Sequence, residues 1–276
     1  MVYLLLAICS SVAVSVLMRL SARRAPDSYW LLSCNYLVCL LIAACFTGFR
    51  GFLPQGAGFR QTVGLGIING AIYLISFVLY QHSVKKNGMV LSSTFMKLGL
   101  LVPIAISLLV FQQIPGFLQA IGFVIALGAI LLLQNKEKGG TFSFGLIVLL
   151  ITGGGANAMS EIFEEVGNPA LSSQFLLYTF LAAFLLCLAF TFAKKEKPCK
   201  ESLLYGFLIG IPNYFSARFL LLSLDQLPAV VAHPTYSAVS VCVVSGLGVL
   251  LFREHLTKRQ WLGMVLIVIS LVLLNI

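Results

Sequence analysis

Lys97 is a charged side chain inside a long apolar run, and its position says most about possible chemistry. It lies nine positions after Gly88, about 14 Å along a helix rising 1.5 Å per residue. If the run spans a membrane, that depth is near the middle of a hydrocarbon core about 30 Å thick. A central lysine costs roughly 2.5 to 3.5 kcal/mol on insertion and should face a wet cavity or an anionic partner. We expect Lys97 to bind an anionic group of a solute, with the Ser93 hydroxyl one turn earlier on the same face. A structural ion pair, or a lysine that reaches a lipid headgroup, is the alternative.

Two further groups of polar and aromatic residues lie in apolar runs. The first recurs at spacings of 4, 3 and 4, which places its members on one helical stripe: Asn69, Tyr73, Ser76 and Tyr80. In lipid such a stripe should face inward, either as contact between helices or as the wall of a solute cavity. The second half of the sequence offers a comparable set: Asn213, Tyr214, Arg218 and Tyr236.

Arg218, Glu161 and His233 are ionisable residues that we expect at a similar depth, near one end of the bundle. Arg218 and Glu161 lie about 24 and 28 Å from the starts of their predicted helices, at the far end of the bundle. His233 lies about 8 Å from the start of its own helix, which begins at that same end. We expect Arg218 to pair with Glu161 when this end of the protein is shut, because arginine binds carboxylates through two hydrogen bonds. His233 or Glu161 is then the candidate for a coupling proton, whereas a static pair that holds the bundle together is the alternative.

Three consecutive glycines, residues 153–155, lie in another apolar run. They permit either the close approach of a second helix or an unwound segment that binds a ligand. Close helix packing is the favoured interpretation, because small residues are typical of helix contacts in membranes.

Several catalytic signatures are absent from the sequence, among them GxxxxGK[ST], HExxH and GxSxG. The two aspartates, Asp27 and Asp225, lie at predicted loops. The seven cysteines lie mostly in apolar runs and have no CxxC spacing that would suggest a metal or redox pair. We therefore expect no catalytic residue, no metal site and no cofactor.

The composition explains why these residues must be positioned by membrane helices. Of the 276 residues, 59% are hydrophobic and 10% are charged, whereas soluble domains carry about 25% charged residues. Residues 139–160, 169–193 and 226–252 contain no Asp, Glu, Lys or Arg, and each exceeds the roughly 18 residues that mark a span. Short alternating segments typical of a membrane barrel are missing. The sequence predicts an all-α integral membrane protein.

Charges, glycines and prolines divide the chain into ten predicted transmembrane helices joined by short connections. Their expected ranges are 2–20, 28–48, 61–82, 88–111, 115–134, 142–162, 171–193, 202–223, 228–252 and 259–275. The connections are too short to fold as soluble domains, so any activity must lie inside the bundle.

The basic residues predict the orientation, because Lys and Arg in short loops stay cytoplasmic. One set of connections and helix ends carries only Arg50 and Arg60. The other set carries fourteen: Arg19, Arg23, Arg24, Lys85, Lys86, Lys136, Lys138, Lys194, Lys195, Lys197, Lys200, Arg253, Lys258 and Arg259. Both termini are therefore expected on the non-cytoplasmic side of a cell membrane. The net charge of +9 fits contact with anionic lipid, and no nucleic-acid partner is expected.

The two halves of the sequence resemble each other. Residues 111–134 align without gaps on residues 252–275, an offset of 141 that pairs Gln119 with Gln260. We expect residues 1–135 and 136–276 to form two five-helix repeats. Because five is odd, the repeats insert with opposite orientations, which is the inverted-repeat plan of secondary transporters with the solute site near the midplane.

Ten short-looped spans in two repeats, each ending in F, polar residues and Q-x-x-G before an apolar helix, resemble the drug/metabolite transporter superfamily in its EamA-like branch. The matching segments are residues 111–122 together with Phe252, Glu254, Gln260 and Gly263. The resemblance implies alternating access, with a cavity lined mainly by the first, third and fourth helices of each repeat. Small multidrug-resistance relatives bind cations through an acidic residue in the first helix. The nearest residues here are Ser11 and Gly153, so that mechanism does not transfer directly.

The sequence thus predicts a secondary transporter for a small polar metabolite, anionic or zwitterionic, with a possible coupling proton. The alternative within transport is an exporter of cationic or amphipathic compounds that uses Glu161 and the aromatic residues. A lipid flippase or a membrane-embedded enzyme is the alternative from a different class.

Overall fold

The computed structural model describes residues 1–25, 29–48, 58–102, 116–133, 144–195, 197–224, 226–227, 229–254 and 256–273. Every regular element in these ranges is helical, which confirms the predicted all-α class. Ten α-helices are described: α1 Val2–Arg24, α2 Tyr29–Thr47, α3 Phe59–Asn87, α4 Met89–Lys97, α6 Phe117–Leu133, α7 Phe144–Val166, α8 Ser172–Ala193, α9 Lys200–Leu224, α10 Ala229–Phe252 and α11 Lys258–Leu273. Two short 3₁₀ turns, η2 Leu98–Leu100 and η3 Pro169–Leu171, complete the described elements.

The helices begin and end close to the predicted positions, with two instructive differences. Helices α1 and α3 continue past their apolar runs to Arg24 and Asn87, and both carry basic residues in their last turn. Positive side chains there interact favourably with the helix C-terminus. The predicted helix 88–111 is described as α4, which gives way to the 3₁₀ turn η2 directly after Lys97. Residues 103–115 lie outside the described part of the chain.

Six helical segments are long and apolar enough to span a membrane: Val2–Arg24, Tyr29–Thr47, Phe59–Asn87, Ser172–Ala193, Lys200–Leu224 and Thr235–Phe252. Shorter apolar stretches lie in α6 and α7. Many large apolar side chains are exposed on the outside of the bundle, for example Ile67, Phe192 and Leu250. A bilayer covers such a surface, so these side chains mark the lipid-facing side of a multi-pass membrane protein.

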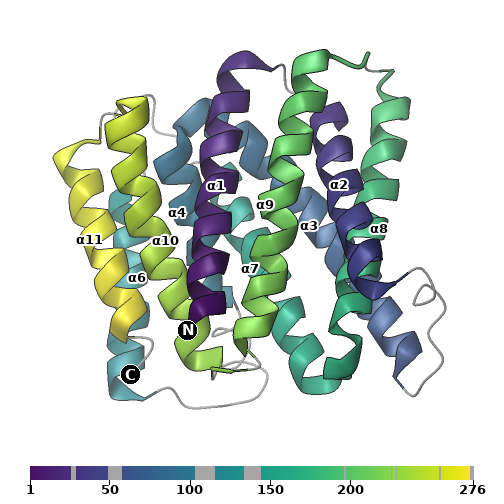
Figure 1. Cartoon of the computed structure of the whole chain (residues 1–276). Coiled ribbons are helices and arrows are strands. Elements are labelled where there is room, and N and C mark those ends of the chain that lie inside the picture. The colour runs from purple at the N-terminus through teal and green to yellow at the C-terminus, as the bar shows by residue number, and fades with distance from the viewer. Residues whose placement is uncertain are drawn as a thin grey trace.

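The helices of the two halves alternate in space. Helix α1 packs against α9 and α10, and α7 packs in the same way against α3 and α4 (Figure 1). Helix α2 packs against α8, and α6 packs against α11. The contacts of α1 with the second half are thus repeated by α7 with the first half, as expected for two inverted repeats. The predicted boundary between residues 135 and 136 lies outside the described residues.

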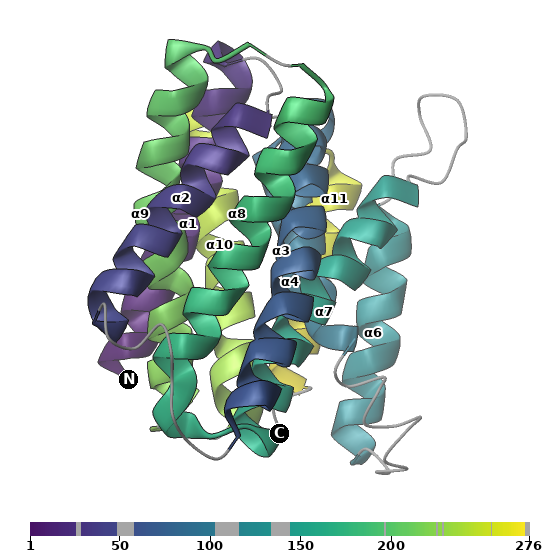
Figure 2. The same cartoon turned by 90° about the vertical axis from the view of Figure 1, so that its right-hand side faces the viewer.

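Consecutive helices run in opposite directions, and both ends of the chain lie at one end of the bundle (Figure 1). At the opposite end, α1, α3, α8 and α10 finish and α2, α4, α9 and α11 begin (Figures 1 and 2). This second end carries the basic residues of the larger set, such as Arg24 and Lys194. We call it the basic end.

The glycines at 153–155 allow a close helix contact. Helix α7 continues through them without interruption. A side-chain carbon at Gly154 would overlap with the backbone oxygen of Gly99, and one at Gly99 would overlap with the backbone nitrogen of Gly154. The segment after α4 therefore lies directly against α7, which fixes where Lys97 lies.

Candidate functional site

A cavity of about 80 Å³ lies within the bundle. Its wall comes from three helices of each half, α1, α3 and α4 from the first and α7, α9 and α10 from the second. The structure brings seven of the ten predicted solute-binding residues to this wall: Tyr73, Ser76, Tyr80, Ser93, Lys97, Asn213 and Tyr236. The volume is enough for several water molecules or a small solute.

Lys97 contributes the positive charge of the cavity. It is the last residue of α4, and its Nζ lies 3.7 Å from the centroid of the Tyr236 ring on α10. This is a cation–π contact, in which the negative face of the ring attracts the ammonium group. In the part of the chain that the structure describes, no carboxylate pairs with Lys97. The ammonium group therefore keeps its capacity to bind an anion.

The Tyr236 ring is itself held by a hydrogen bond. Its hydroxyl group lies 3.0 Å from Ser216 Oγ on α9, and both residues line the cavity. The pair connects α9 and α10 beside Lys97. Ser216 was not among the predicted site residues, although it lies three positions after Asn213 and so shares its helical face.

A chain of hydroxyl groups crosses the cavity wall. The Tyr80 hydroxyl lies 2.7 Å from Ser93 Oγ, which donates to Ser15 Oγ at 3.2 Å. Ser15 in turn donates to the backbone oxygen of Ser11 at 3.2 Å. This chain connects α3, α4 and α1. The Ser93 hydroxyl, which we expected to serve the solute, is bonded to protein groups in this conformation.

Two amide or hydroxyl groups complete the polar wall. Asn213 Nδ2 donates to Asn35 Oδ1 on α2 at 3.1 Å, so the Asn213 side chain is held from behind. Ser76 Oγ is buried and has no hydrogen-bond partner among the residues the structure describes. A buried hydroxyl group without a hydrogen-bond partner destabilises the folded protein, so the Ser76 hydroxyl is suited to form a hydrogen bond with a solute or a water molecule.

The other three predicted residues do not line the cavity. Asn69 Nδ2 donates to Thr179 Oγ1 on α8 at 3.4 Å, which places it between α3 and α8. Arg218 Nη1 donates to Ser173 Oγ at 3.1 Å and to the Tyr214 hydroxyl at 3.4 Å, and its guanidinium carbon lies 4.3 Å from the centroid of the Phe46 ring. Arg218 and Tyr214 thus join α9 to α8 and α2.

The predicted pairing of Arg218 with Glu161 stays a prediction, because the Glu161 side chain lies outside the described residues. His233 is buried within α10, and its Nε2 has no partner within the described ranges. It does not line the cavity. The structure therefore places His233 three residues from Tyr236 without giving it a contact that defines its role.

Four polar wall residues were not among the predicted site residues, namely Ser11, Ser15, Asn157 and Ser216. Small hydroxyl groups occur throughout membrane helices, so their type alone is a weak signal. The signal for Ser11 and Ser15 was their spacing of four residues, which places both on one face of α1. Within the described residues, no group of three His, Cys, Asp or Glu side chains could hold a metal ion.

Comparisons with known proteins agree with this architecture. Residues 141–276 match the EamA-like transporter family. An uncharacterized protein of Haemophilus influenzae is 23% identical over 284 aligned positions, which cover 95% of this chain and 93% of the relative. A crystal structure of a protein superposes with a TM-score of 0.65 at 14% identity, covering 99% of this chain and 94% of the other. That likeness extends the agreement to the fold of the whole chain.

Proposed function

Because the chain belongs to the EamA-like transporter family, we propose that it is a secondary transporter of a small solute with an anionic group. The solute binds in the cavity between the two halves, and the halves rock to expose it to either side of the cell membrane. The observation that carries the anionic preference is Lys97, whose ammonium group rests on the Tyr236 ring at 3.7 Å. A ring face is a weaker partner for an ammonium group than a carboxylate is.

The wall chemistry supports a small, polar solute. Besides Lys97, the cavity offers hydroxyl and amide groups such as Ser76, Asn157 and Asn213. Aromatic faces from Tyr73 and Phe77 supply apolar surface on the same wall. With about 80 Å³ available, this conformation holds a metabolite of a few heavy atoms rather than a large drug.

The charge of the cavity disfavours the alternative of a cation exporter. A quaternary amine at the site would lie close to the Lys97 ammonium, and like charges in a low-dielectric cavity repel strongly. A zwitterion remains compatible with the proposal when its carboxylate faces Lys97 and its ammonium group faces an aromatic ring.

Three further parts of the proposal concern orientation and coupling. The basic end faces the cytoplasm, since the sequence predicts fourteen basic residues on that side of the membrane and two on the other. Both termini are then non-cytoplasmic. A proton taken up by His233 or Glu161 drives the cycle, and Arg218 pairs with Glu161 in the state closed at the termini.

A thermal-shift screen tests the proposal directly. Purified protein is heated with organic acids, amino acids, nucleosides and quaternary amines, because a ligand that binds only the folded state raises its stability. An anion should stabilise the wild type and leave Lys97→Gln unchanged, and that anion should be taken up by proteoliposomes. Stabilisation by quaternary amines alone, equal in both proteins, would refute the anionic preference.

A further inference from the structure

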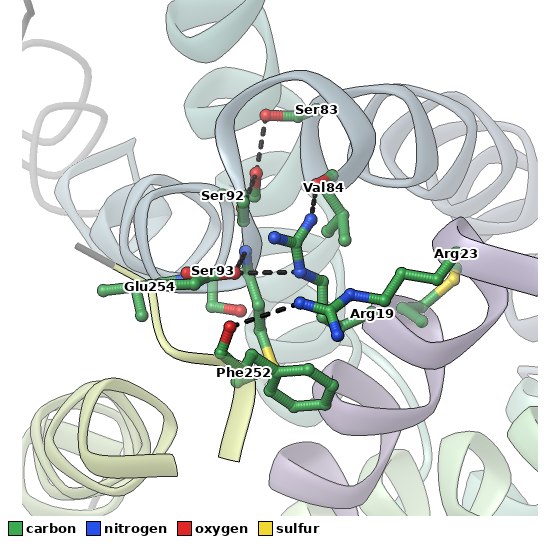
Figure 3. Close-up of polar contacts among 12 residues, drawn as sticks. Arg19, Arg23, Ser83, Val84, Ser92, Ser93, Phe252 and Glu254 are labelled. Carbon is green, nitrogen blue, oxygen red and sulfur yellow. Dashed lines mark hydrogen bonds and ion pairs between the residues drawn. The ribbon is translucent and has the colours of Figure 1, made fainter. Parts of the chain in front are cut away.

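Glu254 connects three helices at the basic end of the bundle. It lies two residues after α10, and its Oε1 is 3.0 Å from Arg19 Nε on α1 (Figure 3). The same carboxylate accepts hydrogen bonds from the first two backbone N–H groups of α4, Met89 N to Oε1 at 2.8 Å and Val90 N to Oε2 at 3.0 Å. Both charged side chains are largely buried, with exposed fractions of 18% for Arg19 and 10% for Glu254.

Two of these contacts are charge-assisted hydrogen bonds, and the third is a close ion pair. The N-terminus of a helix carries a partial positive charge, and its first N–H groups have no partner within the helix. A carboxylate placed there accepts charge-assisted hydrogen bonds, and a buried arginine beside it adds an opposite charge. Glu254 therefore holds α4 through its backbone and α1 through a side chain at the same time.

The local backbone brings Glu254 to this place. Helix α10 ends at Phe252, and Arg253 adopts a left-handed conformation with φ of 51°. Glu254 N then donates to Gly248 O at 3.1 Å, which turns the chain back over the helix end. A side-chain carbon at Gly248 would overlap with Val90 Cγ2, so α10 and α4 touch at this level.

Arginines of α1 extend the same contact to two more helix ends. Arg19 Nη1 donates to Val84 O in the last turn of α3 at 3.0 Å. Arg23 Nη2 donates to Phe252 O at 3.2 Å, and its guanidinium carbon lies 5.4 Å from the centroid of the Phe252 ring. The ends of α1, α3 and α10 and the start of α4 thus meet around Glu254 (Figure 3).

Hydroxyl contacts between α3 and α4 lie between this meeting point and the cavity. The Ser83 and Ser92 hydroxyl groups lie 2.8 Å apart between α3 and α4 (Figure 3). The next residue of α4, Ser93, bonds to Tyr80 and belongs to the cavity wall. Between the cavity and the basic end, the helices thus meet through these hydroxyl contacts together with buried apolar side chains such as Met89 and Val90.

We propose that Glu254 is the gate residue at the basic end, and that the cavity opens there when its carboxylate leaves Arg19 and the N-terminus of α4. This inference rests on the proposed alternating access. Glu254 belongs to the second half, whereas α1 and α4 belong to the first, and all three connected helices line the cavity. Separation of the halves at this end must break these contacts.

The same contact couples the gate to the solute. Helix α4 is nine residues long, and it begins at the Glu254 contact and ends at Lys97. A short rigid helix held at both ends transmits a displacement from one end to the other. A solute that draws Lys97 from the Tyr236 ring therefore shifts the position of the N–H groups that Glu254 binds.

The test measures access to the cavity from each side and needs no solute. Ala217→Cys places a thiol on the cavity wall, and its modification by a negatively charged methanethiosulfonate is followed in vesicles by mass spectrometry, which separates it from the seven native cysteines. Native Cys199, at the start of α9 on the basic end, reports which face the reagent reaches. Loss of charge-assisted contacts in Glu254→Gln should raise the modification rate from the Cys199 side roughly tenfold.

A second variant and a matched control keep the result interpretable. Gly248→Ala pushes α10 from α4 without changing any charge, and it should also raise modification from the Cys199 side. Arg19→Gln should do the same, whereas Arg24→Gln, at an exposed arginine five residues later on α1, should not. Rates within twofold of the wild type for Glu254→Gln, Gly248→Ala and Arg19→Gln, all folded by gel filtration, would overturn the gate.

A charge swap tests whether Glu254 acts through its hydrogen bonds to the N-terminus of α4 or only through its ion pair with Arg19. In the combination of Arg19→Glu with Glu254→Arg, the new arginine cannot accept hydrogen bonds from the α4 N–H groups. We expect the modification rate to stay high in the double variant, and full restoration would overturn the capping role. Because no solute is needed, normal gating with no ligand found in the screen would count against the proposed solute alone.

Discussion

Replacement of Lys97 by glutamine should leave a stable protein that no longer recognises an anion. The change removes a charge that the sequence predicts near the middle of the membrane, which would relieve roughly 2.5 to 3.5 kcal/mol of insertion cost. It also removes the cation–π contact with Tyr236, which is worth about 0.5 to 2 kcal/mol. These effects have opposite signs, so the melting temperature of the empty protein should not fall.

The loss of ligand affinity is larger than the change in stability. A hydrogen bond to a charged group contributes about 1.5 to 3 kcal/mol, which corresponds to a dissociation constant raised roughly 10- to 150-fold. At a ligand concentration of 100 times the wild-type dissociation constant, the wild type gains about 2.7 kcal/mol of stability. A variant that binds about 100-fold more weakly gains only about 0.4 kcal/mol at the same concentration.

The measurement is a thermal-shift titration with the stabilising anion, followed by uptake into proteoliposomes. Tyr236→Phe is the control, because it keeps the ring under Lys97 and removes the hydroxyl group, which bonds to Ser216 and also contacts Lys97 and Ser11. The control should keep most of the anion-induced shift. Normal uptake by Lys97→Gln, or a marked loss of stability without ligand, would refute the assignment of Lys97 as the anion site.

Three other predictions concern topology, the end of the bundle near the termini, and packing. A reporter fused after the last residue should read non-cytoplasmic, and a cytoplasmic reading would reverse the orientation. Arg218→Glu and Glu161→Arg should each impair uptake, and the double variant should partly restore it, whereas additive losses would show that the two residues do not meet. His233→Gln should change the pH dependence of uptake, and an unchanged pH dependence would remove the proton role from that residue. Gly154→Val should lower stability by about 1 to 3 kcal/mol through overpacking against Gly99, seen as a lower melting temperature than in Gly128→Ala, where the added carbon meets open space.

Helix positions were predictable because hydrophobic length in a membrane leaves few alternatives. A run of about 20 apolar residues must satisfy its own backbone hydrogen bonds as a helix. The exceptions have local causes. The basic last turns of α1 and α3 extend these helices beyond the apolar run, and the 3₁₀ turn after Lys97 begins where Gly99 meets Gly154.

The stripe on α3 shows what polarity alone cannot resolve. Asn69 and Tyr73 lie one turn apart on the same face, yet Asn69 bonds to α8 and Tyr73 lines the cavity. The difference arises from Gly66 and Gly70, where a side-chain carbon would overlap with α8. Helix α8 crosses α3 at that level and covers Asn69. A polar side chain in a membrane helix is expected to face the inside of the bundle. Whether it contacts a neighbouring helix or the cavity depends on where that helix crosses.

The sequence identified Glu254 only as part of a repeat motif and predicted no contact for it. In the structure its carboxylate contacts Arg19 and two backbone N–H groups of α4. Its partners Met89 and Val90 lie 165 and 164 positions away in the sequence. A contact with backbone N–H groups leaves no complementary residue type at the partner position. Opposite charge could have suggested Arg19 as a partner of Glu254, but it could not have indicated the contact with the α4 backbone.

Among the described residues that line the cavity, Lys97 is the one lysine, and its presence in only one half has a consequence for how a ligand binds. With the offset of 141 that aligns the two halves, Lys97 corresponds to Ala238, a buried residue of α10. A carrier built from two identical five-helix subunits would present two lysines to one small cavity and would select ligands with matching twofold symmetry. Two halves within one chain can differ in sequence, and here the counterpart of Lys97 carries only a methyl side chain. If Lys97 binds the anionic group as proposed, a ligand with distinct ends is bound in one direction only, which a symmetric dimer cannot achieve.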